Sequence, residues 1–331
     1  MNMRMLTNED YKLLEQLVSI TQNGMHKTMS AYLKTKFKKV IVHEKYIVAI
    51  GDIPIALVAH MDTVFKYPVD NMYYDRQKGV VWSPEGLGAD DRAGIFAIVQ
   101  ILKTGLRPSI ILTTDEESGG IGASALAGIP CPIPDLKYMI QLDRRGTNDC
   151  VFYDCYNPSF IEYVESFGFV EKWGTFSDIS ILMPAWKICG VNLSVGYEDE
   201  HSVSETLHIK PLFDTIAKVR HMLQEEEIPT FEYEELPAHW YNNFGKIKTY
   251  PEDDYGAHCA GCRRLKSEYE MYPVKGKNDT VKLYCPDCIV DKVKWCSTCG
   301  DAYEPDSSAF SNKCADCANK EKKNERSTNK K

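Results

Sequence analysis

Apolar residues in the first two thirds of the chain form short continuous runs separated by segments of helical spacing. Six runs are strand-like: Val40–Val42, Tyr46–Ile50, Ile53–Ala59, Ser109–Thr114, Lys137–Leu142 and Ile188–Val195. Apolar residues three and four apart predict helices over Leu13–Val18, Met25–Phe37, Asp91–Lys103 and Lys210–Gln224. Thr7 is placed to cap the first helix, and Gly51-Asp52 predicts a tight turn. The alternation of strands and helices predicts an α/β domain.

The composition changes after residue 224. Residues 225–255 are rich in Glu, Pro, Tyr and Asn with little periodicity, which predicts a linker or a segment draped over its neighbour. Residues 256–317 contain paired cysteines, and residues 318–331 form a Lys-rich tail that we expect to be disordered. The predicted organisation is therefore a domain at 1–224, a linker at 225–255, a cysteine module at 256–317 and a basic tail at 318–331.

Bulk composition narrows the class of protein. The 331 residues are 44% hydrophobic, enough for one sizeable core and a small second unit, and the formal charge of −8 argues against a protein that coats nucleic acid. No apolar run approaches the roughly 18 residues that suggest a membrane helix, and the N-terminus has no signal-peptide apolar region. We therefore expect a soluble, cytoplasmic protein.

Polar clusters follow the predicted strands. His60 comes directly after Ile53–Ala59, Glu116-Glu117 after Ile110–Thr114, Asp143 after Tyr138–Leu142, and His201 a few residues past Val191–Val195. The carboxyl ends of parallel strands meet at one edge of a sheet, so these side chains should share one crevice. Asp90 precedes a predicted helix N-terminus, where backbone amides favour a carboxylate. Two imidazoles and several carboxylates at one edge indicate a site for a pair of divalent metals.

The segments ALVAHMDTV, GLGADDRAG, TTDEESGG, QLDRRG and GYEDEHSVSE carry a family resemblance. Over about residues 50–210 the chain resembles the co-catalytic di-zinc exopeptidases, the clan of bacterial zinc aminopeptidases, tripeptidase (peptidase T), and carboxypeptidase G and deacetylase relatives. The resemblance implies a three-layer, phosphorylase/hydrolase-like α/β domain with a mixed, mostly parallel sheet. It also implies that Asp90 bridges two metals, with His60 and Asp143 completing one site and Glu117 and His201 the other. By the same resemblance Glu116 would be the general base, and Asp62 would orient His60.

The chemistry of these residues agrees with the implied roles. Zinc takes imidazole and carboxylate ligands and keeps a position open for water at a catalytic site, and Co²⁺ or Mn²⁺ are alternatives. Two such metals can share a hydroxide and stabilise the oxyanion formed at a peptide carbonyl. Glu116 would take the proton of the water and pass it to the leaving amine.

The spacing of the motifs discriminates among relatives. Only 30 positions separate His60 from Asp90, which leaves no room for the dimerisation domain inserted there in tetrahedral-particle aminopeptidases. Only 58 separate Asp143 from His201, too few for the lid of the tripeptidase and carboxypeptidase branch. The sequence therefore favours a minimal catalytic domain, as in single-domain zinc aminopeptidases. A metal-dependent amidohydrolase or deacetylase acting on a non-peptide amide is one alternative, and a zinc-module binding protein with a vestigial hydrolase domain is another.

Two features next to these motifs have more than one interpretation. Arg144-Arg145 could contact substrate or a neighbouring acidic loop. Asp178, in the sequence FSDIS, resembles a Ser-Asp element near the site of some relatives but could equally cap a helix.

Eight of the twelve cysteines form four Cys-x-x-Cys pairs: Cys259/Cys262, Cys285/Cys288, Cys296/Cys299 and Cys314/Cys317. Each pair can bind one metal with two thiolates, so the module is expected to hold two structural Zn²⁺ in four-thiolate sites. Consecutive pairing would give two ribbon-like units, which we favour over cross-braced pairing of the RING type. Cys131, Cys150, Cys155 and Cys189 have no ligand spacing and are expected to be small buried hydrophobes.

The expected partners follow from the first domain and the cysteine module. A peptide or small amide is the expected substrate of the first domain. The cysteine module is expected to recruit a protein partner rather than nucleic acid, because eight thiolates and two zincs bring its charge to about zero. No membrane contact is expected.

Overall fold

The computed structural model divides the chain into two compact units, Met1–Asn243 and Phe244–Lys331. The structure describes residues 5–174, 176–235, 256–262, 265–267, 272–275, 281–285, 288–289, 293–298 and 302–303. Among these residues no helix is both long and apolar enough to cross a membrane.

The first unit contains seven helices and twelve strands in its described residues. The helices are α1 (Asn8–Val18), α2 (Gln22–Lys36), α3 (Ala89–Lys103), α4 (Ile121–Ala127), α5 (Pro158–Ser166), α6 (Asp178–Trp186) and α7 (Ile209–Leu223). The strands are β1 (Lys39–His43), β2 (Tyr46–Ile50), β3 (Ile53–His60), β4 (Tyr73–Asp75), β5 (Val80–Trp82), β6 (Pro108–Thr113), β7 (Tyr138–Arg144), β8 (Asp149–Val151), β9 (Val170–Glu171), β10 (Cys189–Ser194), β11 (Tyr197–Glu198) and β12 (Thr206–His208).

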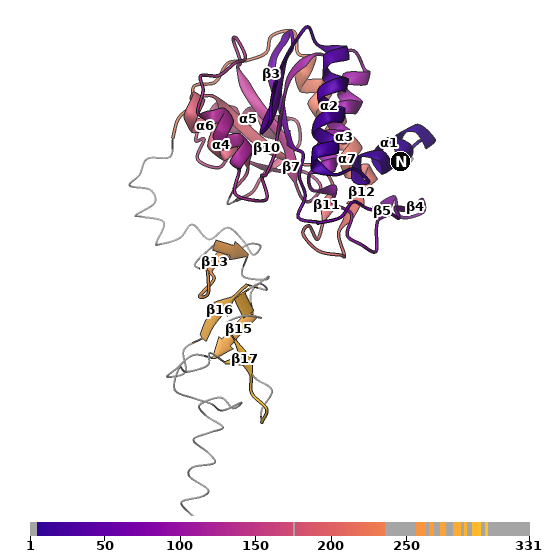
Figure 1. The fold of residues 1–331 in the computed structure, drawn as a ribbon. Coiled ribbons are helices and arrows are strands. Elements are labelled where there is room, and N and C mark those ends of the chain that lie inside the picture. Colours follow the sequence, from indigo (N-terminus) through magenta and orange to yellow (C-terminus); the bar gives the residue numbers. More distant parts are fainter. Residues whose placement is uncertain are drawn as a thin grey trace, which may run out of the picture. The chain divides into compact units, whose positions relative to one another are not determined.

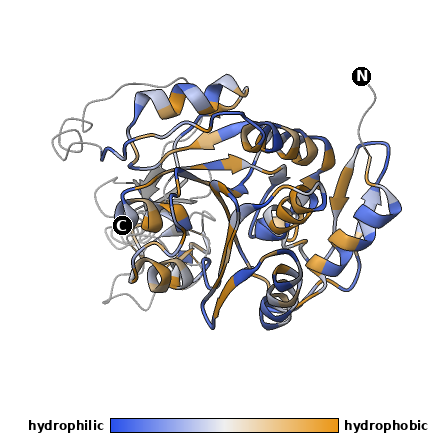
Figure 2. Ribbon diagram, turned by 90° about the horizontal axis from the view of Figure 1, so that it is seen from above, coloured by the Kyte–Doolittle hydropathy of each residue, from blue (hydrophilic) through white to orange (hydrophobic). Residues whose placement is uncertain are grey.

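An eight-stranded mixed sheet forms the centre of this unit, in the order β1-β2-β6-β3-β7-β10-β8-β9. The four central strands β6, β3, β7 and β10 run parallel, while β1, β2 and β8 pair antiparallel with their inner neighbours. Helices α3 and α7 lie on one face and α4 and α6 on the other (Figure 1). The strands are mostly hydrophobic, whereas the helices carry both kinds of residue (Figure 2). The predicted three-layer α/β fold is therefore confirmed.

The Gly51-Asp52 turn connects two strands that are not neighbours. β2 and β3 both pair with β6, which lies between them, so the predicted tight turn does not close a hairpin. The amide of Asp52 donates to the Arg107 carbonyl at 3.0 Å. A Cβ at Gly51 would lie 2.0 Å from that carbonyl oxygen, so only glycine allows the chain to pass so close to the start of β6.

A second, four-stranded sheet joins segments that are far apart in the sequence, in the order β11-β12-β5-β4. β5 lies between His60 and Asp90, and β12 follows His201, so their antiparallel pairing brings the two segments together. β4 and β5 form a hairpin whose turn is closed by a Gly79 amide that donates to the Asp75 carbonyl at 2.8 Å. Sequence patterns did not predict this sheet, because strands of two or three residues show no period.

The N-terminal segment and the chain after α7 both pack on this unit. Thr7 caps α1 with a capping box, as predicted. Residues 225–235 lie against the domain: the Phe231 ring packs at a tilt against those of Tyr138, Phe160 and Tyr163. The rest of the predicted linker, 236–255, lies outside the described residues. Cys150, Cys155 and Cys189 are buried as expected, but Cys131, near a chain turn, is only half-buried.

The described residues of the second unit form short strands. They are β13 (Gly256–His258), β14 (Leu265–Ser267), β15 (Tyr272–Lys275), β16 (Val281–Tyr284), β17 (Lys294–Trp295) and β18 (Ala302–Tyr303). β13 and β14 pair antiparallel, and the others form a sheet in the order β16-β15-β18-β17. The predicted tail at 318–331 lies outside the described residues.

Candidate metal centre

The parallel core of the large sheet brings the predicted residues to one edge. His60 is the last residue of β3, and its register partner on β6 is Thr113, which places Glu116 and Glu117 in the loop just beyond. Asp143 lies inside β7, which continues to Arg144, two residues further than the apolar run suggested. All these strands point their carboxyl ends the same way, which is why the side chains meet.

Asp90 lies between two histidines. Its Oδ1 is 3.0 Å from Nε2 of His60, and its Oδ2 is 3.1 Å from Nε2 of His201. Burial alone would raise the pKa of Asp90, but hydrogen bonds from His201 and His60 hold it well below its usual value. Each oxygen of this carboxylate therefore faces a different imidazole.

Two groups of candidate ligands share Asp90. In one, ligand atoms of His60, Asp90 and Asp143 lie within 4.8 Å of one another, and in the other those of Asp90, Glu117 and His201 do. Nε2 of His201 is 3.0 Å from the Glu117 carboxylate, and Nε2 of His60 is 3.5 Å from Asp143. The His201 side chain is 47% exposed while that of His60 is 1% exposed, so the second group opens to solvent.

Asp143 is held by several donors. Gln141 and the Ser177 hydroxyl donate to its Oδ2 at 2.9 and 3.0 Å, and the Tyr197 hydroxyl donates to Oδ1 at 3.2 Å. Burial and the charge of Asp90 raise the pKa of Asp143 to about 7. Like charges in a buried space explain the shift, and a cation among them would relieve it.

Asp62 connects His60 to the loop that carries the glutamates. Its Oδ1 lies 3.3 Å from Nδ1 of His60, and the amides of Glu116 and Glu117 donate to its two oxygens at 3.1 Å each. The contact with Nδ1 leaves Nε2 of His60 to face Asp90, as the predicted orienting role requires.

Glu116 lies between these groups. A ligand set of His60, Glu116 and Glu117 also falls within 4.8 Å. Burial, together with the charges of Asp143, Asp178 and Asp90, raises the pKa of Glu116 to about 10, and the charge of His60 opposes the shift. Cations beside these carboxylates would oppose this shift and favour the ionised form of Glu116.

Two buried carboxylates to which the sequence analysis assigned no role, those of Glu205 and Asp91, bind backbone amides around the site. Oε2 and Oε1 of Glu205 accept the amides of Gly88 and Asp90, at 2.5 and 3.0 Å. Asp91 accepts the amides of His60 and Gly94 at 3.3 and 2.8 Å. Glu205 lies within the quoted segment GYEDEHSVSE, so the signal was present, but nothing local indicates that its partners are more than a hundred residues away.

Helix α3 begins in an irregular conformation that presents Asp90. Asp90 and Asp91 have non-helical backbone angles although they lie in its first turn. A Cβ at Gly94 would lie 2.2 Å from the Leu142 carbonyl and 2.4 Å from the Asp91 carboxylate. The glycine of the DDRAG segment therefore allows the helix to approach β7 closely enough for Asp90 and Asp143 to meet.

The structure shows the contacts of the two features that had more than one interpretation. Nη1 of Arg145 is 3.2 Å from the Glu200 carboxylate, and Nε of Arg144 is 3.8 Å from that of Asp149, so both arginines contact acidic neighbours. The cap of α6 is Ser177, not Asp178. Asp178 is buried and accepts a hydrogen bond from the Thr113 hydroxyl.

In the second unit the thiols of the first two cysteine pairs lie together. Those of Cys259, Cys262, Cys285 and Cys288 all lie within 4.8 Å of one another. This is the geometry of consecutive pairing. Cys296 is buried in the same unit, and Cys299, Cys314 and Cys317 lie outside the described residues.

Comparison with solved structures finds chains of the same fold. A tripeptidase from Staphylococcus aureus matches with a TM-score of 0.51 and 18% identity, over 67% of this chain and 99% of that one. The TET aminopeptidase of a marine sediment Thaumarchaeota archaeon matches with a TM-score of 0.53 and 12% identity, over 67% of this chain and 98% of that one. The chain shares the fold of these peptidases. No family model and no curated protein matches its sequence.

Proposed function

We propose that the first unit is a two-metal aminopeptidase. The observation that carries the proposal is the position of Asp90. Each of its two oxygens faces a histidine, and each histidine lies beside a further carboxylate. A carboxylate shared in this way is the arrangement that bridges two metals. The residues present suit a pair of metal ions: Asp90 would bridge the two ions. His60 and Asp143 would complete one site, and Glu117 and His201 would complete the other.

The donor chemistry supports zinc. Imidazole nitrogens and carboxylate oxygens are typical ligands of catalytic Zn²⁺, and Co²⁺ or Mn²⁺ could occupy the same positions. When bound, the metals would polarise the scissile carbonyl and make a nucleophile of water at neutral pH. The Glu116 carboxylate would take a proton from the attacking water and deliver it to the nitrogen of the leaving group.

The compactness of the first unit supports the minimal catalytic domain that the spacing of the motifs predicts. The segments between His60 and Asp90 and between Asp143 and His201 belong to the same compact unit, Met1–Asn243, as the sheet. The second of them forms β8, α5, β9, α6 and β10, all of which build or cover that sheet. Within the described residues neither segment forms a lid of its own.

The test is hydrolysis of a panel of aminoacyl amides with free or blocked N-termini, with Glu116→Gln as the negative control. Cleavage that requires a free N-terminus is the expected result. Cleavage of blocked substrates alone would contradict the aminopeptidase proposal and would favour an amidohydrolase. If the metal-loaded wild type were as inert as the variant on every substrate, the hydrolase proposal would be wrong.

Glu205 tests the positioning of Asp90. In Glu205→Gln one acceptor oxygen becomes an NH₂ group that would face an amide donor, so the backbone at Gly88–Asp90 should loosen. We expect the affinity for Zn²⁺ to fall by about 10- to 100-fold. Zinc titration against a chromophoric chelator measures it, and Glu198→Gln, on the exposed side of β11, should leave it unchanged. Equal Zn²⁺ affinities in the two variants would mean that Glu205 does not position Asp90.

We also propose that the cysteine module holds structural zinc. The thiols of Cys259, Cys262, Cys285 and Cys288 form the four-sulfur set of such a site, and the pairs Cys296/Cys299 and Cys314/Cys317 would form a second. Purified protein should contain about four zincs per chain in all, and Cys285→Ser should lose about one. Cys131→Ser, at a half-buried cysteine outside the module, should lose none. Two zincs in the wild type would mean that one half of the metal assignment is wrong.

A further inference from the structure

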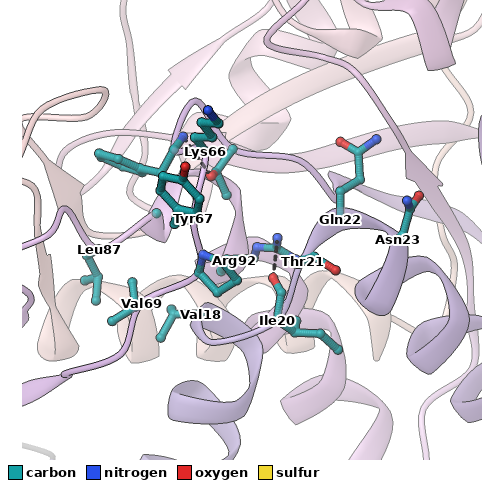
Figure 3. A pocket seen from close by; sticks show the side chains of 14 residues that line it. Val18, Ile20, Thr21, Gln22, Asn23, Lys66, Tyr67, Val69, Leu87 and Arg92 are labelled. Carbon is teal, nitrogen blue, oxygen red and sulfur yellow. Dashed lines mark hydrogen bonds between the residues drawn. The ribbon is translucent and has the colours of Figure 1, made fainter.

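A cavity of about 340 Å³ lies beside the metal centre and includes none of the candidate ligands. It is lined by the α1–α2 connection, the loop after β3 and the start of α3, with Arg92 among its walls (Figure 3). Ile20, Phe65, Val69 and Leu87 make part of its lining apolar. Its volume lies in the range of about 300–1,000 Å³ that is usual for small-molecule sites.

Arg92 brings a buried positive charge to this cavity. Its side chain is 3% exposed, and Nη2 donates to the Ile20 carbonyl at 3.2 Å. Nε and Nη1 are also buried, yet neither has a hydrogen-bond partner among the described residues. An arginine guanidinium carries a positive charge at neutral pH and offers five N–H donors. Unmade hydrogen bonds of a buried charged group are costly, so these two donors indicate a missing acceptor.

The charges nearest to Arg92 do not supply that acceptor. Asp62 and Asp91 both act on its pKa. However, Asp62 accepts the amides of Glu116 and Glu117, and Asp91 accepts those of His60 and Gly94. Among the described residues, neither carboxylate is a hydrogen-bond partner of Nε or Nη1 of Arg92.

The N-terminus of α2 reaches the same cavity. Thr21 is its N-cap, and Gln22 and Asn23, its first two residues, line the cavity. First-turn amides have no intrahelical acceptor and attract anions, and no acidic residue lies in this first turn. The Gly24 amide already donates to the Thr21 hydroxyl at 3.2 Å, so the helix dipole and the earlier amides would act on an anion. Lys66, an exposed residue of the opposite wall, adds a second cation. Figure 3 shows Lys66 and Tyr67 on one side of Arg92 and Thr21 on the other.

We propose that this cavity binds a small organic oxyanion, a carboxylate or a phosphate ester, whose charged head pairs with Arg92. The free Nε and Nη1 would donate to the oxygens of the head, the α2 N-terminus and Lys66 would face the same charge, and the apolar walls would hold the organic body. Guanidinium groups recognise both head groups with two parallel hydrogen bonds. The site is independent of the peptidase proposal.

Calorimetric titration of the zinc-loaded full chain with inorganic phosphate, phenyl phosphate and phenylacetate tests the site. We expect the phenyl compounds to bind, and Arg92→Gln to weaken them at least about tenfold. Tighter binding of phenyl phosphate would identify a phosphate ester as the ligand, and tighter binding of phenylacetate a carboxylate. No heat change from any probe up to about 10 mM would overturn the proposal.

Two further variants separate this cavity from the metal centre and from misfolding. His201→Ala, which alters an exposed candidate metal ligand, should bind the probes as the wild type does; loss of binding there would mean that they bind the metals. Lys66→Ala should weaken binding about threefold or more, whereas Lys34→Ala, in the exposed last turn of α2, should not. If Arg92→Gln fails to fold, equal affinities of these two lysine variants would refute the site.

Discussion

Replacing Glu116 with glutamine is expected to lower kcat by about 10²- to 10⁴-fold while both catalytic metals stay bound. The substitution keeps the size and hydrogen-bonding reach of the side chain but removes its ability to accept a proton. Because Glu116 belongs to neither of the two ligand groups that share Asp90, metal content measured by atomic absorption should match that of the wild type. Steady-state hydrolysis of an aminoacyl amide measures the rate.

The neighbouring acid provides the matched control for this prediction. Asp115 carries the same functional group one residue earlier, but its carboxylate pairs with Lys45 at 3.0 Å on the outer side of the loop. Asp115→Asn should therefore change kcat by less than about threefold, since a surface ion pair of this kind contributes little. A large loss in both variants would point to loop disruption rather than to a missing base.

Loading the chelator-treated protein with Zn²⁺ is expected to raise its Tm by roughly 8–15 °C. Without cations, burial and mutual repulsion raise the pKa values of Glu116 and Asp143 to about 10 and about 7. Metals at these carboxylates would relieve that repulsion and bind only the folded chain, so saturation at about 1,000 times Kd contributes about 4 kcal/mol. Differential scanning calorimetry with and without the ion gives the shift.

Asp90→Asn separates this shift from the contribution of the cysteine module. Loss of the shared carboxylate charge should weaken both metal sites at once, so most of the Zn²⁺-dependent rise in Tm should disappear. Asp70→Asn, at an exposed position before β4, should show the full rise. If the rise in Asp90→Asn equals that of the wild type, the stabilising zinc binds elsewhere in the chain.

The sequence predicted the central strands and the meeting of their polar ends well, for a physical reason. Parallel strands covered on both faces are continuous apolar runs, so the predicted segment Ile53–Ala59 differs from β3 by one residue. Residues directly after such runs, such as His60, must gather at one edge whatever the order of the strands. For this reason the gathering of His60, Glu117 and Asp143 could be anticipated from the strands, whereas the place of Asp90 between the histidines was implied by the family resemblance.

The features that escaped prediction depend on contacts between distant segments. β6 lies between β2 and β3 because both strands pair with it rather than with each other, and the residues around Gly51 do not indicate this pairing. Glu205 and Arg92 are charged residues that would ordinarily be assigned to the surface. Their burial follows from backbone groups supplied by other segments: the amides of Gly88 and Asp90 for Glu205, and the Ile20 carbonyl for Arg92.

The turn of the β4–β5 hairpin is a position where the fold can accept inserted residues. Its turn residues Arg76, Gln77 and Lys78 are exposed, and the Gly79 amide closes the turn on Asp75. The two ends of the turn are held side by side by strand pairing, on the small sheet that joins the segment before Asp90 to the segment after His201. A folded domain spliced into this turn would therefore leave the ligand geometry undisturbed. Residues added at this turn would thus change the length of the segment between His60 and Asp90 without changing the pairing of β5 with β12.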